Sequence, residues 1–249
     1  MSEIVTGEAY VKAITSLESD RRTRAAFQNL VLKIARPGAV LFDFGAGPGL
    51  DARLYAEHGF SVAAYDVDPK MREFFLVHCR EFIETGQVLL YGGSYREFLA
   101  GNNRAERGAD LVTSNFAPLN LVRDLRELFA KFHALTRPNG CVLASVLSPY
   151  WVGDLKCPWW WRNALRLWRD GYYLVPGPLA PTVRRRLANY VRESAPFFAL
   201  EHVFPGMPTE GTTDIGGMNV SRGSRHAWLQ LTRCQFMFLL FRKQNSLAC

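Results

Sequence analysis

Short apolar runs alternate with longer amphipathic segments along the first 150 residues of the chain. The apolar runs predict buried strands, and the segments with apolar positions at helical spacing predict the helices that connect them. We expect strands over residues 40–44, 61–66, 88–91, 111–115 and 140–147, and helices over 18–36, 50–58, 70–85, 96–100 and 121–135. This alternation predicts an α/β fold with helices on both faces of a parallel sheet.

Two more strands are expected near the C-terminus, over residues 197–204 and 234–242, as a reversed hairpin at the sheet edge. The complete expectation is a doubly wound sheet of seven strands, mostly parallel, with one antiparallel C-terminal strand. With 48% hydrophobic and 21% charged residues, the 249-residue chain has the composition of a folded domain rather than a disordered one.

The first predicted strand ends in a glycine-rich loop. Asp43 is followed by Gly45, Gly47 and Gly49 at alternate positions. Glycine permits the backbone angles of a tight loop and leaves room for a ligand near the backbone. The loop precedes a predicted helix, whose free N–H groups favour a carboxylate or phosphate. Its spacing differs from Gly-x-Gly-x-x-Gly, the pattern of dinucleotide-binding loops.

Polar residues also follow the next three predicted strands. Asp66 lies about twenty residues beyond the glycine loop, the distance at which an acid from the second parallel strand can accept both ribose hydroxyls. Asp68 precedes a proline and is expected instead to cap the next helix. The third strand leads into Ser94 and Tyr95, and the fourth leads into Asn115.

These strand ends resemble the cofactor-binding motifs of class I S-adenosylmethionine-dependent methyltransferases. The glycine loop resembles their motif I, residues 109–120 resemble motif IV, and the Arg-Pro-Asn-Gly of residues 137–140 resembles their (K/R)-P-G-G turn. The resemblance implies a Rossmann-like fold, S-adenosylmethionine as cofactor and S-adenosylhomocysteine as product. The cofactor-binding residues that it implies are Asp43, Gly45, Ala46, Gly47, Gly49, Asp66, Val67, Ser94, Tyr95, Asn115, Phe116 and Ala117.

The resemblance also implies a division of the chain. We expect a single methyltransferase domain over residues 1–249. Its parts are an N-terminal helical cap (1–37), a cofactor-binding core (38–147), an insertion over the substrate (148–196) and a C-terminal β hairpin (197–249).

Two positions depart from the family's patterns. In the family, the segment after the third strand often supplies an acid that contacts the adenine amino group. Here the segment has Ser94 and Tyr95, so the adenine contact has to come from a hydroxyl, an aromatic face or the backbone. Methyltransferases that act on nucleic-acid bases carry (D/N/S)-P-P-(Y/F) after the fourth strand, whereas residues 115–118 are Asn-Phe-Ala-Pro. The paired prolines and the final aromatic residue are therefore lost.

We accordingly expect transfer of a methyl group to O or N of a small organic acceptor, by in-line displacement. Nucleic acid is disfavoured as a partner. An RNA or DNA methyltransferase and a non-catalytic S-adenosylmethionine-binding protein are the alternatives.

The insertion is rich in aromatic and basic residues and supplies +5 of the formal net charge of +7. Its residues 161, 165 and 168 are Trp, Leu and Trp and are expected on one helical face, whereas arginines 162, 166 and 169 are expected on another. Three interpretations compete. It could be a lid packed by its tryptophans with solvated arginines, an aromatic pocket for a planar or apolar acceptor, or a surface for anionic lipid or nucleic acid.

Few residues are expected to take part in the chemistry, because methyl transfer mainly needs alignment of the reactants and exclusion of water. Tyr10 and His226 are the candidates for a general base. The residues expected to contact the acceptor are Tyr10, Trp151, Trp160, Tyr172 and Tyr173.

Neither a metal site nor a membrane span is expected. The five cysteines show no Cys-x-x-Cys pairing, and no His/Asp/Glu cluster has metal spacing. No run reaches the roughly 20 apolar residues of a membrane span, and the N-terminus lacks the features of a secretory signal. We expect a cytoplasmic protein with reduced thiols, monomeric or homodimeric, for which peripheral membrane contact stays open.

Overall fold

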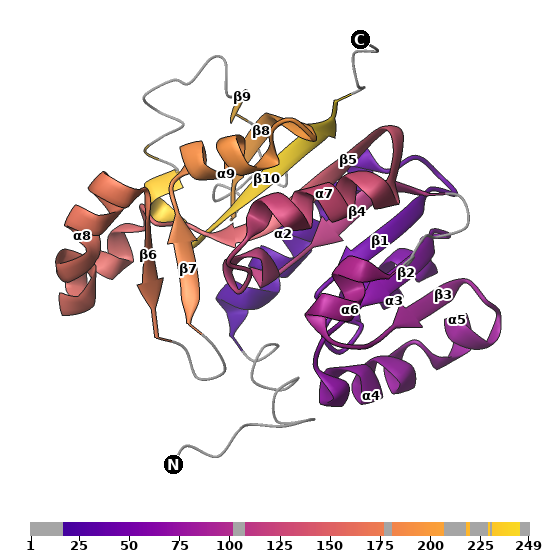
Figure 1. The fold of residues 1–249 in the computed structure, drawn as a ribbon. Coiled ribbons are helices and arrows are strands. Elements are labelled where there is room, and N and C mark those ends of the chain that lie inside the picture. Colours follow the sequence, from indigo (N-terminus) through magenta and orange to yellow (C-terminus); the bar gives the residue numbers. More distant parts are fainter. Residues whose placement is uncertain are drawn as a thin grey trace, which may run out of the picture.

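A computed structural model describes residues 17–101, 108–176, 181–206, 218–219, 229 and 231–244. The strands of its main sheet are β1 (Val40–Phe44), β2 (Ser61–Tyr65), β3 (Val88–Tyr91), β4 (Ala109–Ser114), β5 (Thr136–Leu147), β8 (Phe198–Pro205), β9 (Met218–Asn219) and β10 (Phe236–Lys243). They lie in the order β3-β2-β1-β4-β5-β10-β8-β9 (Figure 1).

Strands β1 to β5 pair in parallel, and β10 pairs antiparallel with both β5 and β8. The prediction of a mostly parallel Rossmann-like sheet with an antiparallel C-terminal strand is therefore confirmed. Strand β10 lies inside the sheet rather than at its edge, because residues 236–241 are apolar and buried on both faces. The two-residue β9 extends the expected seven strands to eight.

Helices cover both faces of the sheet (Figure 1). They are α2 (Glu18–Ile34), α3 (Leu50–Glu57), α4 (Pro69–His78), α5 (Arg80–Glu84), α6 (Tyr95–Ala100), α7 (Leu125–Leu135), α8 (Pro158–Asp170) and α9 (Leu187–Ser194). Apolar residues of α2, α3 and α4 form one core cluster with the sheet, and those of α6, α7 and α9 form a second cluster. The sheet is thus buried between two helical layers, as a parallel sheet requires.

Three predicted boundaries were wrong. The helix expected over residues 70–85 is divided at Cys79, whose ψ of 12° ends α4. The Cys79 side chain packs against the backbone of Gly49, with Sγ 3.5 Å from the Gly49 carbonyl oxygen. Helix α7 begins at Leu125 rather than residue 121, because Asp124 caps it. Strand β5 begins at Thr136 rather than residue 140. Residues 137–140, which were expected to form a turn, therefore lie within the strand, where its pairing with β4 shifts register.

Between β5 and α9 the chain forms a small unit that we call the cap, residues 148–186. It contains the 3₁₀ turn η2 (Val152–Lys156), α8, and a separate hairpin of β6 (Tyr172–Val175) and β7 (Thr182–Arg185). In Figure 1 the hairpin lies between the main sheet and α8, which is on the outer side of β6.

Two neighbouring arginines of β7 fix the cap: Arg184 ties β7 to the first residues of the cap, and Arg185 attaches the cap to the main domain. Arg184 forms an ion pair of 2.6 Å with Asp154 and donates to the carbonyl of Ser148, just beyond β5. Arg185 donates to the carbonyls of Val122 and Arg123, in the segment that follows β4. Since adjacent residues of a strand point to opposite faces, one short strand reaches both places.

The structure agrees with the lid interpretation of the insertion only in part: Arg162, Arg166 and Arg169 are exposed, as it expects. This interpretation places the arginines in solvent and the tryptophans inside, whereas Arg184 and Arg185 are 6% and 5% exposed. By contrast, Trp161 and Trp168 are 63% and 75% exposed.

Candidate cofactor and acceptor site

The carboxyl ends of β1, β2 and β4 meet at one edge of the sheet. Phe44 of β1 is in register with Tyr65 of β2, and Asp43 with Thr113 of β4. The glycine loop crosses the end of β2, since the N–H groups of Gly45 and Ala46 both donate to the Tyr65 carbonyl. The residues that follow these three strands are therefore brought together, as the sequence predicts.

Asp66 follows β2 and lies against the glycine loop at this edge. Its carboxylate accepts hydrogen bonds from the backbone N–H of Gly47 at 2.7 Å and of Asp68 at 2.8 Å. Burial raises the pKa of Asp66, and these two donors oppose that shift. Arg72 holds the same segment by donating to the carbonyls of Asp66 and Val67. A buried carboxylate fixed at the glycine loop suits recognition of a sugar diol.

The side chain of Asp43 is buried and only partly paired. One carboxyl oxygen accepts from the Thr113 hydroxyl at 2.9 Å, and the other has no partner among the described residues. Burial, and secondarily the nearby Asp51, raise the pKa of Asp43 to about 8. An orphaned buried carboxyl oxygen is costly unless a ligand satisfies it, and the ammonium group of a methionine moiety would do so. The site therefore fits an amino-acid-bearing cofactor such as S-adenosylmethionine.

A second polar cluster lies beside Asp43 and was not foreseen from the sequence. The Asp51 carboxylate, at the start of α3, accepts from Arg24 at 2.5 Å and from Gln28 at 2.7 Å, both on α2. The Asn115 amide donates to the same carboxylate at 3.1 Å. An acid just after the glycine loop could have pointed to Asp51, but no local pattern predicts a partner 27 residues away.

The loop after β4 has an unusual backbone. Phe116 and Ala117 have φ angles of 58° and 68°, in the left-handed region that non-glycine residues seldom occupy. The side chain of Asn115 accepts from the Phe116 N–H, and the guanidinium of Arg24 lies 4.5 Å from the Phe116 ring centre. Strained residues of this kind persist where the surroundings fix them and concentrate at functional sites. This observation agrees with the motif IV interpretation.

The segment after β3 is organised differently. The Ser94 hydroxyl and Glu97 form a capping box at the start of α6, so this hydroxyl is engaged in the helix cap. Tyr95 packs 6.5 Å from Phe44, ring centre to ring centre, and Val67 is 55% exposed. The exposed apolar surface of Val67, which follows β2, and the backbone near Ser94, which follows β3, could contact an adenine ring.

The residues expected to contact the acceptor are less closely grouped. Tyr173 is buried beside Trp159, with ring centres 5.9 Å apart, whereas Trp151 and Trp160 are half-buried. Tyr172 is 45% exposed. Tyr10 and His226 lie outside the described residues, so their roles stay predictions.

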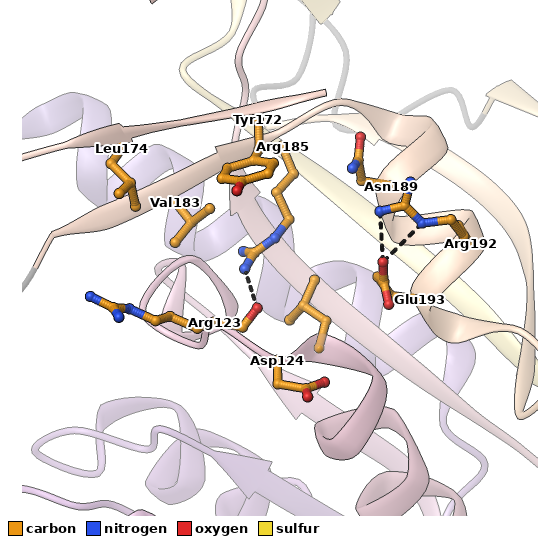
Figure 2. Close-up of a pocket in the computed structure, with 10 residues that line it drawn as sticks. Arg123, Asp124, Tyr172, Leu174, Val183, Arg185, Asn189, Arg192 and Glu193 are labelled. Atoms are coloured by element: carbon orange, nitrogen blue, oxygen red, sulfur yellow. Dashed lines mark hydrogen bonds and ion pairs between the residues drawn. The ribbon is translucent and has the colours of Figure 1, made fainter. Parts of the chain in front are cut away.

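A cavity of about 550 Å³ opens beneath the cap hairpin (Figure 2). Its walls come from β6, β7, α9 and the start of α7, and Arg185 crosses it to the Arg123 carbonyl. Among its wall residues, Tyr172 was expected to contact the acceptor, and the cofactor-binding residues given above do not line it. It is therefore separate from the edge at which the β1, β2 and β4 ends meet.

The described part of the chain holds neither a metal-binding cluster nor a membrane-spanning helix. No group of three or more His, Cys, Asp or Glu side chains there is placed to hold a metal ion. None of the helices described there has the length and apolar character to span a bilayer.

Substitutions at two glycines of the loop should differ in their effect on stability. A Cβ at Gly45 would lie 2.5 Å from Cγ of Pro118, whereas a Cβ at Gly47 meets no heavy atom within 4 Å. Both residues have positive φ. We expect Gly45→Ala to lower the free energy of unfolding by about 1–3 kcal/mol more than Gly47→Ala, because only the former is overpacked. Chemical denaturation measures this difference, and equal losses would contradict it.

The raised pKa of Asp43 predicts pH-dependent binding. Below pH 8 the free protein keeps this carboxyl protonated, and a bound ammonium favours the ionised form. The affinity for S-adenosylhomocysteine should therefore rise between pH 6 and pH 8, by up to about tenfold per pH unit, with release of a proton. Calorimetry in buffers of different ionisation enthalpy measures both effects.

Asp43→Asn is the matched control for this prediction. A folded-state pKa above the unfolded value of 3.8 stabilises the fold at low pH, and this contribution is lost as the pH rises through about 8. The variant should therefore bind weakly at every pH and should gain stability over the native protein from pH 4 to 8. An unchanged pH profile of binding in Asp43→Asn would show that another group titrates.

Comparison with known proteins agrees with this site. A family model described as a methyltransferase domain matches residues 17–193, which is more than half of the chain. The chain therefore belongs to the methyltransferase domain family. It is a class I S-adenosylmethionine-dependent methyltransferase, and S-adenosylmethionine is its cofactor. No match was found among curated protein sequences.

Three solved structures illustrate the shared fold. An S-adenosylmethionine-dependent methyltransferase from Mesorhizobium loti is 18% identical, with a TM-score of 0.58 over 87% of this chain and 97% of that one. The Burkholderia thailandensis 1,6-didemethyltoxoflavin-N1-methyltransferase is 18% identical, with a TM-score of 0.61 over 95% and 84%. A TehB-like methyltransferase from Corynebacterium glutamicum is 12% identical, with a TM-score of 0.55 over 88% of both. At these identities the likeness concerns the fold alone.

Proposed function

We propose that the protein transfers a methyl group to an oxygen or nitrogen atom of a small organic acceptor. The observation that carries this proposal is the attachment of the cap. Buried hydrogen bonds of Arg184, Arg185 and Asn120 connect β7 to the segments that follow β4 and β5. A cap fixed at that edge encloses a small molecule more readily than it admits a polymer.

The proposed roles of the residues follow from their positions. S-adenosylmethionine supplies an activated methyl group when it is bound. Asp66 accepts from the ribose hydroxyls, Asp43 pairs with the amino group, and Phe116 covers the reacting end together with the cap. Alignment and exclusion of water of this kind can contribute about 7–11 kcal/mol to catalysis.

Two further observations support a small acceptor. The segment Asn115-Phe116-Ala117-Pro118 departs from the pattern of enzymes that methylate nucleic-acid bases. The Burkholderia thailandensis enzyme, which shares the fold, holds 1,6-didemethyltoxoflavin together with S-adenosylhomocysteine. This fold can therefore accommodate a small acceptor beside the cofactor product.

The test separates acceptor classes. The purified protein is incubated with S-adenosylmethionine and, in separate samples, with the small-molecule, nucleic-acid and protein fractions of a cell extract. We expect formation of S-adenosylhomocysteine with the small-molecule fraction, together with a product heavier by one methylene unit in mass spectrometry. Turnover with nucleic acid alone would establish an RNA or DNA methyltransferase. Bound cofactor without turnover in any fraction would indicate a non-catalytic binding protein.

A further inference from the structure

The outward side of α8 carries an exposed apolar strip. Trp161, Leu165 and Trp168 are 63%, 69% and 75% exposed, and their spacing places them on one side of the helix. Of the 13 residues of α8, Leu167 is the buried one. In Figure 1 the helix lies on the outside of the cap, away from the main sheet. Grouped exposed side chains of this size usually mark an interaction surface.

A row of arginines borders this strip. Arg162, Arg166 and Arg169 each follow one of the apolar residues by one position, so they lie next to the strip around the helix. Arg169 pairs with Asp170 at 2.7 Å. Arg162 and Arg166 form no ion pair with the residues that the structure describes, and both are exposed. We call these six residues, Trp161, Arg162, Leu165, Arg166, Trp168 and Arg169, the α8 face.

We propose that the α8 face docks the protein onto the surface of an anionic lipid bilayer. Tryptophan favours the level of the lipid headgroups, where the ring packs on apolar groups and the N–H keeps a hydrogen-bond partner. The Trp161 N–H already donates to the Leu155 carbonyl at 2.9 Å, so only its ring has to meet the bilayer. Leu165 then enters the boundary of the acyl chains, and the arginines meet the headgroup phosphates, an arrangement typical of amphipathic helices that lie in the interface. The positive charge of the arginines and the apolar strip together favour an anionic bilayer as the partner.

Two other occupants fit these observations less well. A two-fold contact between two α8 faces would bring the arginine rows of both copies into one interface, where like charges repel. Single-stranded nucleic acid binds by stacking its bases on aromatic side chains. Leu165, at the centre of the strip, has no ring for such stacking.

Vesicle flotation with the whole protein tests the proposal. The vesicles consist of phosphatidylcholine alone or of phosphatidylcholine mixed equally with phosphatidylglycerol. We expect binding to the mixed vesicles, release as salt is added, and little binding to the neutral vesicles. Arg162→Gln with Arg166→Gln should lower the partition coefficient about 25-fold, since each arginine near an anionic surface contributes about a factor of five. Leu165→Ser with Trp168→Ser should lower it at least about tenfold.

The matched control lies on another helix. Leu76 and Val77 of α4 are 49% and 63% exposed, and Leu76→Ser with Val77→Ser should leave vesicle binding unchanged. Binding of S-adenosylhomocysteine is measured on every sample, because the α8 face shares no residue with the proposed cofactor site. Retained cofactor affinity shows that a variant is folded and keeps this test independent of the acceptor.

Three results would overturn the proposal. The first is no binding of the native protein to the mixed vesicles, and the second is an equal loss of binding in the α4 control. The third is a native dimer in light scattering that becomes a monomer when Leu165 and Trp168 are replaced, which would make the α8 face a contact between two copies.

Discussion

Asp66→Ala should lower the affinity for S-adenosylhomocysteine at least about a hundredfold. A hydrogen bond to a charged group is worth about 1.5–3 kcal/mol, and the proposed contact with the ribose supplies two of them. Each 1.4 kcal/mol corresponds to a factor of about ten in the dissociation constant. Isothermal calorimetry with the folded variant measures the loss directly.

Asp68→Ala is the matched control for this experiment. Asp68 lies two residues further on and caps α4 by accepting from the Lys70 N–H at 2.9 Å. Its removal should cost about 1 kcal/mol of stability and leave the affinity nearly unchanged. If both variants lose affinity equally, the loss comes from disturbance of this segment, and the ribose contact assigned to Asp66 is wrong.

Arg184→Met should destabilise the protein by about 3–5 kcal/mol. The side chains of Arg184 and Asp154 are 8% and 4% exposed, so the substitution leaves an uncompensated carboxylate in the interior. Burial already raises the pKa of Asp154, an effect that Arg184 opposes. Chemical denaturation measures the loss. The affinity for S-adenosylhomocysteine should change little, because the proposed cofactor residues belong to other elements.

Two further variants identify the cause of this loss. The double variant Arg184→Met/Asp154→Leu removes both charges and should recover much of the stability, because apolar replacement of a complete buried ion pair is often neutral or favourable. Arg169→Met breaks an exposed ion pair and should leave the denaturation midpoint unchanged. A native-like Arg184→Met would show that this ion pair does not hold the cap.

The sheet was predictable from sequence because its signals are local. The apolar runs gave the bounds of β1 and β3 as the structure has them, and residues 236–241 were recognisable as a buried strand. The glycines and the carboxylates that follow the strands carry spacing that depends only on the parallel sheet. For this reason the prediction brought Asp43, Asp66 and Asn115 to one edge.

The cap and its contacts were not predictable in the same way. Arg184 and Arg185 belong to a run of three arginines, a pattern typical of a solvated charged segment. In the structure, however, both side chains of this pair are buried. The strands β6 and β7 have four residues each, too few to show a clear alternation. Arg24 reaches Asp51 only through the packing of α2 on α3, which no local pattern encodes.

The exposure of Trp161 and Trp168 was not predictable from the sequence either. Trp161 and Trp168 lie at helical spacing, a pattern that usually indicates a core-facing stripe. Periodicity shows that a helix has an apolar side but not what covers it. In α8 the apolar strip faces outward, and this difference is the basis of the proposed membrane contact.

All of these assignments depend on joint binding of S-adenosylmethionine by the ends of β1, β2 and β4. A crystal structure of the protein with S-adenosylhomocysteine tests it most directly. We expect the nucleoside at this edge, with both ribose hydroxyls about 2.5–3.0 Å from the Asp66 carboxylate and the amino group beside Asp43. A ligand bound elsewhere, such as in the cavity beside Arg185, would contradict it.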